Sequence, residues 1–175
     1  DRWEYALGLR YEHYQRDVRL LNTGQSYPYA IHQLYPSLSL KNNLSSGWSW
    51  RMATSRRVQR TNNFELNPIP EREHSETLER GDPELLPEFV TNAEVGAQKQ
   101  FGKGSMYLNV YYQHSKNPIQ RVNSVYADTI LHRVYTNADF AERWGTEIGG
   151  EWKVLDKVKL NGGVNLYQYS ITGKI

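Results

Sequence analysis

A two-residue hydrophobic period runs through most of the chain and limits the folds that it can adopt. Within 106–113, for example, Met106, Leu108 and Val110 alternate with Tyr107 and Asn109. Side chains two apart lie on the same face of a β-strand, so this period is typical of strands with one apolar face. No segment shows a convincing 3.6-residue period, and we predict an all-β fold. The other alternating segments are 3–12, 48–55, 144–152 and 158–167.

The pattern divides into about seven strands joined by connections of alternating length. We predict strands near 2–16, 31–43, 46–58, 87–101, 105–123, 129–154 and 157–171. Short turns are expected at 42–45, 102–104 and 155–157, longer loops at 17–30 and 59–86, and a loop of moderate length near 124–128. Because consecutive antiparallel strands reverse direction, the short turns should all lie at one end of an up-and-down meander.

Composition excludes several classes of protein. The mean hydropathy of −0.75 and the lack of a long apolar run exclude a transmembrane helix, but alternating barrel strands also average out as polar. A net charge of +2 without an aromatic-basic cluster gives no reason to expect nucleic acid as a partner. The chain has no cysteine, which excludes disulfides and thiolate metal sites.

Alternation alone is compatible with a soluble β-sandwich binding module, whose tyrosines and tryptophans would suit carbohydrate, and with an outer-membrane β-barrel. The tryptophans are compatible with both, since indole rings pack in the core of a sandwich and also form girdles on barrels. Trp3, Trp48, Trp50 and Trp152 lie near the short-turn ends of their strands, in register with apolar residues. We predict that they form a girdle at a membrane interface, where indole rings are favoured. They should share a face with Leu108, Val110, Leu160 and Val164.

The residues on the opposite face are polar, as expected for the lumen of a barrel. We predict that this face carries Arg51, Asn109, Gln113, Glu147, Glu151, Asn161 and Asn165.

Several motifs occur in the order found in one family. They are the runs 35–40, 55–60, 65–68, 81–88 and 92–96, followed by Asn137, Gly145 and Glu147. This set resembles the barrel region of TonB-dependent outer-membrane receptors, especially the outer-membrane β-barrel proteins of the Bacteroidota. The family pattern GNPxLxPE is met here with Asp82 in place of Asn, and Arg60-Thr61 departs from a frequent Arg-Pro.

The resemblance implies a function and an incomplete domain. Receptors of this kind have about 22 strands around a plug that contacts TonB. We therefore expect residues 1–175 to be a partial barrel domain, about a third of the whole, without the plug and the remaining strands. The implied activity is energy-coupled uptake of a small nutrient, such as an iron chelate, a vitamin, a glycan or a peptide, across the bacterial outer membrane. Lipid and the TonB complex are the other implied partners.

The stretch 80–89, RGDPELLPEF, precedes an alternating segment. In that family it leads from an extracellular loop into a barrel strand, and Pro87 suits the first residue of a strand because it has no N–H to donate. The Arg-Gly-Asp within it is incidental.

No motif indicates catalysis or a cofactor. The five histidines have no metal-ligand spacing, and no nucleophile motif marks an outer-membrane esterase, so we predict neither an enzyme nor a metal site. An acidic run at 71–79 is read as a solvated loop. Ligand contacts are expected on the loops, with Tyr27, Tyr29, Phe64 and Arg72 as candidates.

Overall fold

The computed structural model of the chain describes residues 2–74, 76–126, 130–155 and 157–173. No helix in these ranges is long and apolar enough to cross a membrane. The strands are β1 (Arg2–Arg19), β2 (Ser26–Asn43), β3 (Trp48–Gln59), β4 (Glu71–His74), β5 (Thr77–Arg80), β6 (Glu88–Phe101), β7 (Gly104–Lys116), β8 (Ile119–Tyr126), β9 (Ile130–Asn137), β10 (Phe140–Leu155) and β11 (Val158–Thr172), and the helix α1 spans Asn63–Leu66.

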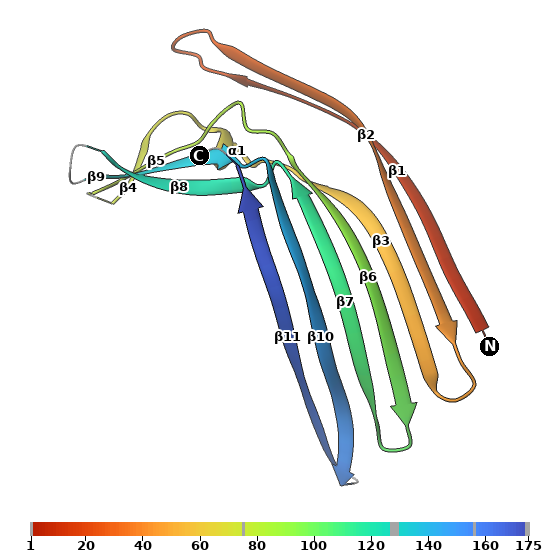
Figure 1. Cartoon of the computed structure of the whole chain (residues 1–175). Helices are drawn as coiled ribbons and strands as arrows, with labels where there is room; N and C mark the ends of the chain where they lie inside the picture. The colour runs from red at the N-terminus through yellow and green to blue at the C-terminus, as the bar shows by residue number, and fades with distance from the viewer. Residues whose placement is uncertain (1, 75, 127–129, 156, 174–175) are drawn as a thin grey trace.

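Seven long strands form one antiparallel sheet in the order β1-β2-β3-β6-β7-β10-β11. This order is the up-and-down meander expected from the sequence, with no crossover among the seven strands. Three short connections, after β2, β6 and β10, lie together at one end of the sheet (Figure 1). The chain reverses at the other end through the longer segments 60–87 and 117–139. Asp156, in the turn after β10, lies outside the described residues.

Two of the predicted strands are wrong in length, because the chain leaves the sheet near Pro118. The predicted strand 105–123 ends as β7 at Lys116, and the predicted strand 129–154 is divided between β9 and β10. The break has a local cause: Asn117 adopts a positive φ of 54°, and Pro118 has no N–H for the ladder.

The longer connections contain more structure than the sequence predicted. The segment 60–87 includes α1, β4 and β5, and β1 and β2 extend through most of the expected loop 17–30. A second sheet has the order β4-β5-β9-β8, in which β5 and β9 pair in parallel. It projects from the loop end of the main sheet (Figure 1). It does not lie over the main sheet, as the second layer of a sandwich would.

The register of strand pairing is staggered across the main sheet. A row of residues that pair directly across the sheet lies at different distances from the turn end of each strand. In β1 the row is one residue from the turn-end residue Arg2, whereas in β10 it is seven residues from the turn-end residue Leu155. The hairpin ends therefore step along the sheet (Figure 1). A stagger of this kind accompanies strand tilt in the wall of a barrel. That row is Trp3, Asn42, Trp50, Ala97, Leu108, Ile148 and Val164.

The buried side chains gather at the loop end, around the stretch 80–89. A capping box between Asn62 and Glu65 fixes α1, and the amides of Gly81 and Asp82 donate hydrogen bonds to two carbonyls, those of Asn67 and Glu65, at the C-terminal end of that helix. The stretch therefore places Pro87 directly before β6, as predicted. The buried apolar residues are Tyr35, Leu66, Leu85, Pro87, Phe89, Val90, Ala138 and Ala141.

Candidate functional site

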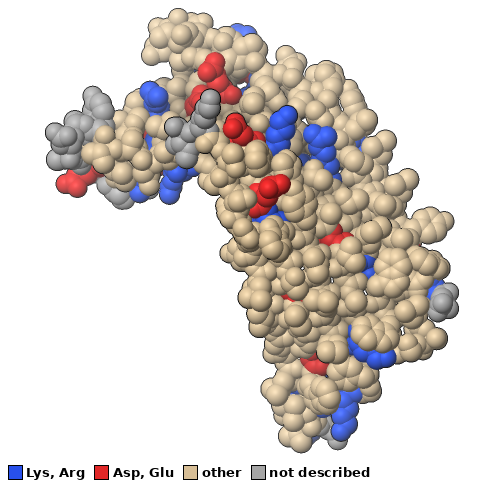
Figure 2. Space-filling view, in the orientation of Figure 1, with Lys and Arg blue, Asp and Glu red and all other residues tan. Residues whose placement is uncertain are grey.

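One face of the main sheet is apolar and uncovered. We call the face that carries the row of Trp50, Leu108 and Val164 the apolar face. Val110 and Leu166 lie in the next row, and both are more than half exposed. In the view of Figure 2, charged side chains are sparse over the long strands and gather toward their ends. A contiguous exposed apolar surface of this kind requires a nonaqueous or protein neighbour.

The four predicted girdle tryptophans lie on the apolar face, at the turn end of their strands. Trp3 of β1 and Trp50 of β3 both pair with Asn42 of the strand between them, β2. Their rings meet edge to face with centroids 5.3 Å apart. Trp48 begins β3, and Trp152 lies three residues from the end of β10. The predicted sharing of a face with Leu108, Val110, Leu160 and Val164 is confirmed by the register.

A second set of aromatic residues was missed in the sequence. Tyr11 and Trp144 lie on the apolar face eight residues along the same strands from Trp3 and Trp152. Eight residues of strand span about 26 Å along the strand, which at a tilt of about 40° is a height of about 20 Å, comparable to the apolar band of about 25 Å on outer-membrane barrels. The repeated eight-residue spacing of aromatic residues within a strand was a signal available in the sequence.

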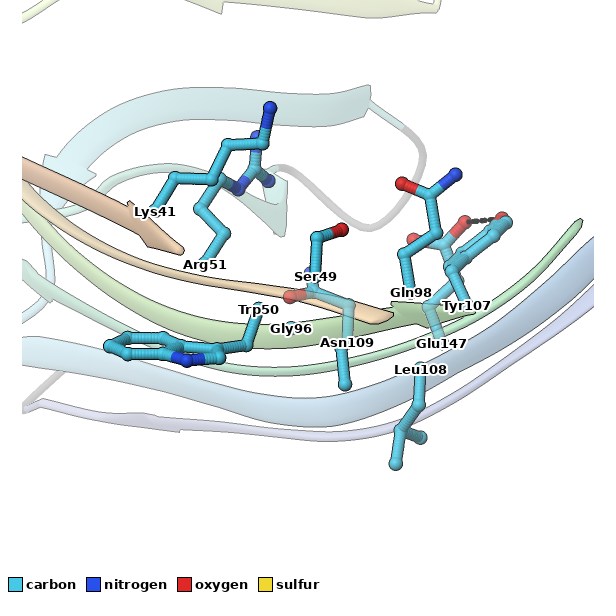
Figure 3. A pocket seen from close by; sticks show the side chains of 11 residues that line it. Lys41, Ser49, Trp50, Arg51, Gly96, Gln98, Tyr107, Leu108, Asn109 and Glu147 are labelled. Carbon is cyan, nitrogen blue, oxygen red and sulfur yellow. Dashed lines mark hydrogen bonds between the residues drawn. The ribbon is translucent and has the colours of Figure 1, made fainter. Parts of the chain in front are cut away.

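The opposite face of the sheet is polar. Figure 3 shows Lys41, Arg51 and Gln98 on the side of the sheet opposite to Trp50 and Leu108. Arg51 pairs with Glu94 at 2.8 Å, and the Tyr107 hydroxyl donates to Glu147 at 2.7 Å. The register confirms the predicted polar face of Arg51, Asn109, Gln113, Glu147, Glu151, Asn161 and Asn165.

At the loop end, the polar face carries three stacked arginine–tyrosine pairs, which we call the arginine–tyrosine cluster. The guanidinium carbons lie 5.0 to 5.2 Å from the ring centroids. At this distance the cation and the ring attract each other. Glu12 is the carboxylate in ion pairs with two of the arginines. The three pairs are Arg10 with Tyr35, Arg16 with Tyr29, and Arg60 with Tyr14.

Arg16 connects β1 to the segment 60–87. Its guanidinium donates to the Thr61 hydroxyl at 2.5 Å and to the carbonyls of Pro83 and Leu85. Its Nε is buried and has no hydrogen-bond partner among the residues that the structure describes. The hydroxyl of the neighbouring Tyr29 is uncharged at neutral pH, as tyrosine hydroxyls ordinarily are. The cluster thus combines positive charge with neutral aromatic hydroxyls.

The structure does not bring the four predicted ligand residues together. Tyr29 belongs to the arginine–tyrosine cluster. Tyr27 lies two residues away on β2, opposite Val18. Phe64, on α1, packs against Tyr135 with centroids 6.1 Å apart, and Arg72 is on β4. The cluster arginines were missed because Arg10 and Arg16 lie in a predicted strand, and only the strand register aligns them with the tyrosines of β2.

A tilted antiparallel meander with one apolar, aromatic-bounded face and one polar face defines the wall of a transmembrane β-barrel. A family model described as the outer membrane protein beta-barrel family matches residues 1–175. The chain belongs to this family, and its location is the bacterial outer membrane. No curated protein sequence matches the chain.

Solved structures share the fold at low sequence identity. The siderophore receptor PirA from Pseudomonas aeruginosa has a TM-score of 0.68 and 17% identity, over 83% of this chain and 31% of that one. The copper transporter OprC has a TM-score of 0.75 and 15% identity, over 97% and 26%. The FrpB iron transporter from Neisseria meningitidis has a TM-score of 0.70 and 16% identity, over 100% and 25%. The chain spans less than a third of the length of these structures.

Proposed function

We propose that this chain is a segment of the barrel wall of a TonB-dependent outer-membrane receptor that takes up a small nutrient. The observation that supports it most is the staggered seven-stranded meander with an apolar and a polar face. The family motifs at 81–88 and 92–96 support the dependence on TonB. In this proposal the other strands, and the plug that contacts TonB, are supplied by further sequence of the same protein.

We further propose that the tryptophans at the turn end form a girdle at one membrane interface. Tyr11 and Trp144 would mark the other interface. The polar face then lines the lumen, and the arginine–tyrosine cluster lies near the entrance on the side of the long connections. No arrangement of residues in the described ranges favours an enzyme over a receptor, and the structural neighbours are receptors and transporters.

The arginine–tyrosine cluster is the proposed place of ligand contact. Two of the three arginines share the carboxylate of Glu12, which leaves the cluster with net positive charge and favours a ligand with anionic groups. The tyrosine rings and hydroxyls add apolar and hydrogen-bonding surface. The similar solved structures are a siderophore receptor, a copper transporter and an iron transporter, which supports a metal-containing nutrient as the first substrate class to test.

Uptake in cells tests the proposed function. A strain that lacks the intact protein should lose growth on one scarce nutrient among iron chelates, vitamins, glycans and peptides. Deletion of TonB, or collapse of the proton gradient, should cause the same loss in the parent strain. Unchanged accumulation of that nutrient without TonB would contradict the proposal, because it would show passive diffusion through a pore.

The substitution Tyr29→Ala tests the site, with Tyr27→Ala as its matched control. Tyr29 stacks on Arg16, whereas Tyr27 lies two residues away on the same face and is in none of the three arginine–tyrosine pairs. Loss of the ring should weaken binding of the nutrient identified above by about tenfold, which corresponds to about 1.4 kcal/mol. Tyr27→Ala should change the Kd by less than about twofold. Equal effects of the two substitutions on Kd would place ligand contact elsewhere.

A further inference from the structure

The loop ends of β1 and β2 form a two-stranded ribbon beyond the rest of the sheet. Pairing of β2 with β3 stops at Ser37 and Ser55, whereas β1 and β2 stay paired as far as Arg19 and Ser26. Figure 1 shows this ribbon bending away from β3. A two-stranded ribbon is only marginally stable by itself, so contacts across it have an unusually large influence on its order.

Two histidines lie opposite each other on this ribbon. His13 and His32 are a directly paired set in the register, and their rings stack with centroids 4.2 Å apart and planes 26° apart. Both residues are exposed. The Tyr11 hydroxyl lies 2.7 Å from Nδ1 of His32. They are 19 positions apart in the sequence, so only the register brings them together.

We propose that His13 and His32 bind one divalent late transition-metal ion, which clips β1 to β2. Imidazole nitrogen is a preferred ligand of Zn²⁺ and Cu²⁺. Two nitrogens bound to one ion, each about 2.0–2.1 Å from it, lie about 3 Å apart. The rings are stacked 4.2 Å apart with planes 26° apart, so their in-plane lone pairs do not converge, and at least one exposed ring must turn about its side-chain bonds to bring two nitrogens to that separation.

The contact with Tyr11 prepares His32 for this role. When Nδ1 carries the proton, it donates to the Tyr11 oxygen and leaves the Nε2 lone pair free for a metal. A ring fixed by a hydrogen bond from its second nitrogen is the usual arrangement of a metal-binding histidine. Within the described ranges no further histidine or acid completes a cluster of three, so water would occupy the remaining positions on the ion.

The proposed metal site is separate from the proposed route of the nutrient. His13 and His32 lie on the same face as Tyr11, two positions beyond it, whereas Arg16 and Tyr29 point to the opposite face. The inference is therefore independent of the proposed function. Cu²⁺ should bind more tightly than Zn²⁺, following the general order of stability of divalent metal complexes.

Titration with Cu²⁺ tests the proposal on the intact protein, purified without a histidine tag. We expect the wild type to have one site that binds at least about tenfold more tightly than any site in His13→Ala or His32→Ala, because two linked ligands act together. Electron paramagnetic resonance of the bound Cu²⁺ should show two nitrogen ligands in the wild type. His114→Ala is the control, since His114 lies beside Glu142 and away from the ribbon.

Amide hydrogen exchange tests whether the metal ion links β1 to β2. Zn²⁺ should slow amide hydrogen exchange of residues 11–19 and 26–34 in the wild type and leave the exchange of His13→Gln unchanged. Equal Cu²⁺ affinity of the wild type and His13→Ala would overturn the proposal, as would a loss of the tight site in His114→Ala. Because both ribbon histidines are exposed, the variants should keep the fold, and unchanged mobility of the unheated protein in gel electrophoresis checks this.

Discussion

Val110→Arg should destabilise the protein in lipid by about 1–3 kcal/mol, somewhat less than arginine costs at the midplane of a barrel, because Val110 lies nearer the loop-end aromatic residues than the turn-end ones. Val110 lies on the apolar face, paired with Val95 and Thr146, and about half of it is exposed. Its row lies between the aromatic residues of the turn end and those of the loop end. The measurement is the urea dependence of the folded fraction of the intact protein in phospholipid vesicles.

The neighbouring residue provides the matched control. Asn109 is adjacent on β7 but belongs to the polar face, opposite Gly96 and Glu147. An arginine there can extend into water beside a glycine, so Asn109→Arg should cost less than about 1 kcal/mol. If the two arginines destabilised the protein equally, or if Asn109→Arg were the worse, the assignment of the lipid-facing side would be wrong.

Gly81→Ala should release the segment 60–87 from its place at the loop end. A Cβ atom at Gly81 would lie 2.7 Å from the Asn67 nitrogen and closer still to the Glu65 carbonyl oxygen, both of which are backbone atoms. The main chain of α1 would have to move, and its hydrogen bonds with Gly81 and Asp82 would be lost. Forcing atoms into a packed site costs about 1–3 kcal/mol.

Limited trypsin digestion measures this effect. Local opening by about 1.4 kcal/mol should raise the rate of cleavage after Arg72 or Arg80 by about tenfold. Gly162→Ala is the control, since a Cβ there meets nothing within 4 Å. Cleavage of Gly81→Ala at the wild-type rate would show that the stretch 80–89 does not hold the segment in place.

The sequence was sufficient for the main sheet because the register of a half-buried strand is strongly constrained. A shift of one residue would move Leu108 and Val110 to the polar face and Asn109 to the apolar face. The alternation was therefore enough to predict which side chains share a face, and the spacing of turn residues was enough to predict the meander. The end of β7 was missed although Asn117 and Pro118 gave a local signal for it.

The second sheet and the side-chain clusters depend on contacts between distant segments. Glu79 of β5 is buried and accepts a hydrogen bond from Tyr135 of β9, 56 positions away. Similarly, Arg60 meets Glu12 and Tyr14 only after β3 and β1 have taken their places in the sheet. Alternation within a single strand carries no information about such pairs. The candidate ligand residues were therefore predicted from loop position alone, and only Tyr29 belongs to the cluster.

The central claim is that the apolar face of the seven-stranded sheet lies against lipid. None of the 175 residues is cysteine, so single cysteines with spin labels can be placed at each position from 106 to 113 of β7, in an intact protein whose cysteines elsewhere, if it has any, are replaced. In the intact protein in bilayers, labels at 106, 108, 110 and 112 should collide readily with oxygen, which concentrates in lipid. Labels at 107, 109, 111 and 113 should not. A uniform profile, or high oxygen accessibility at the odd positions, would contradict the claim.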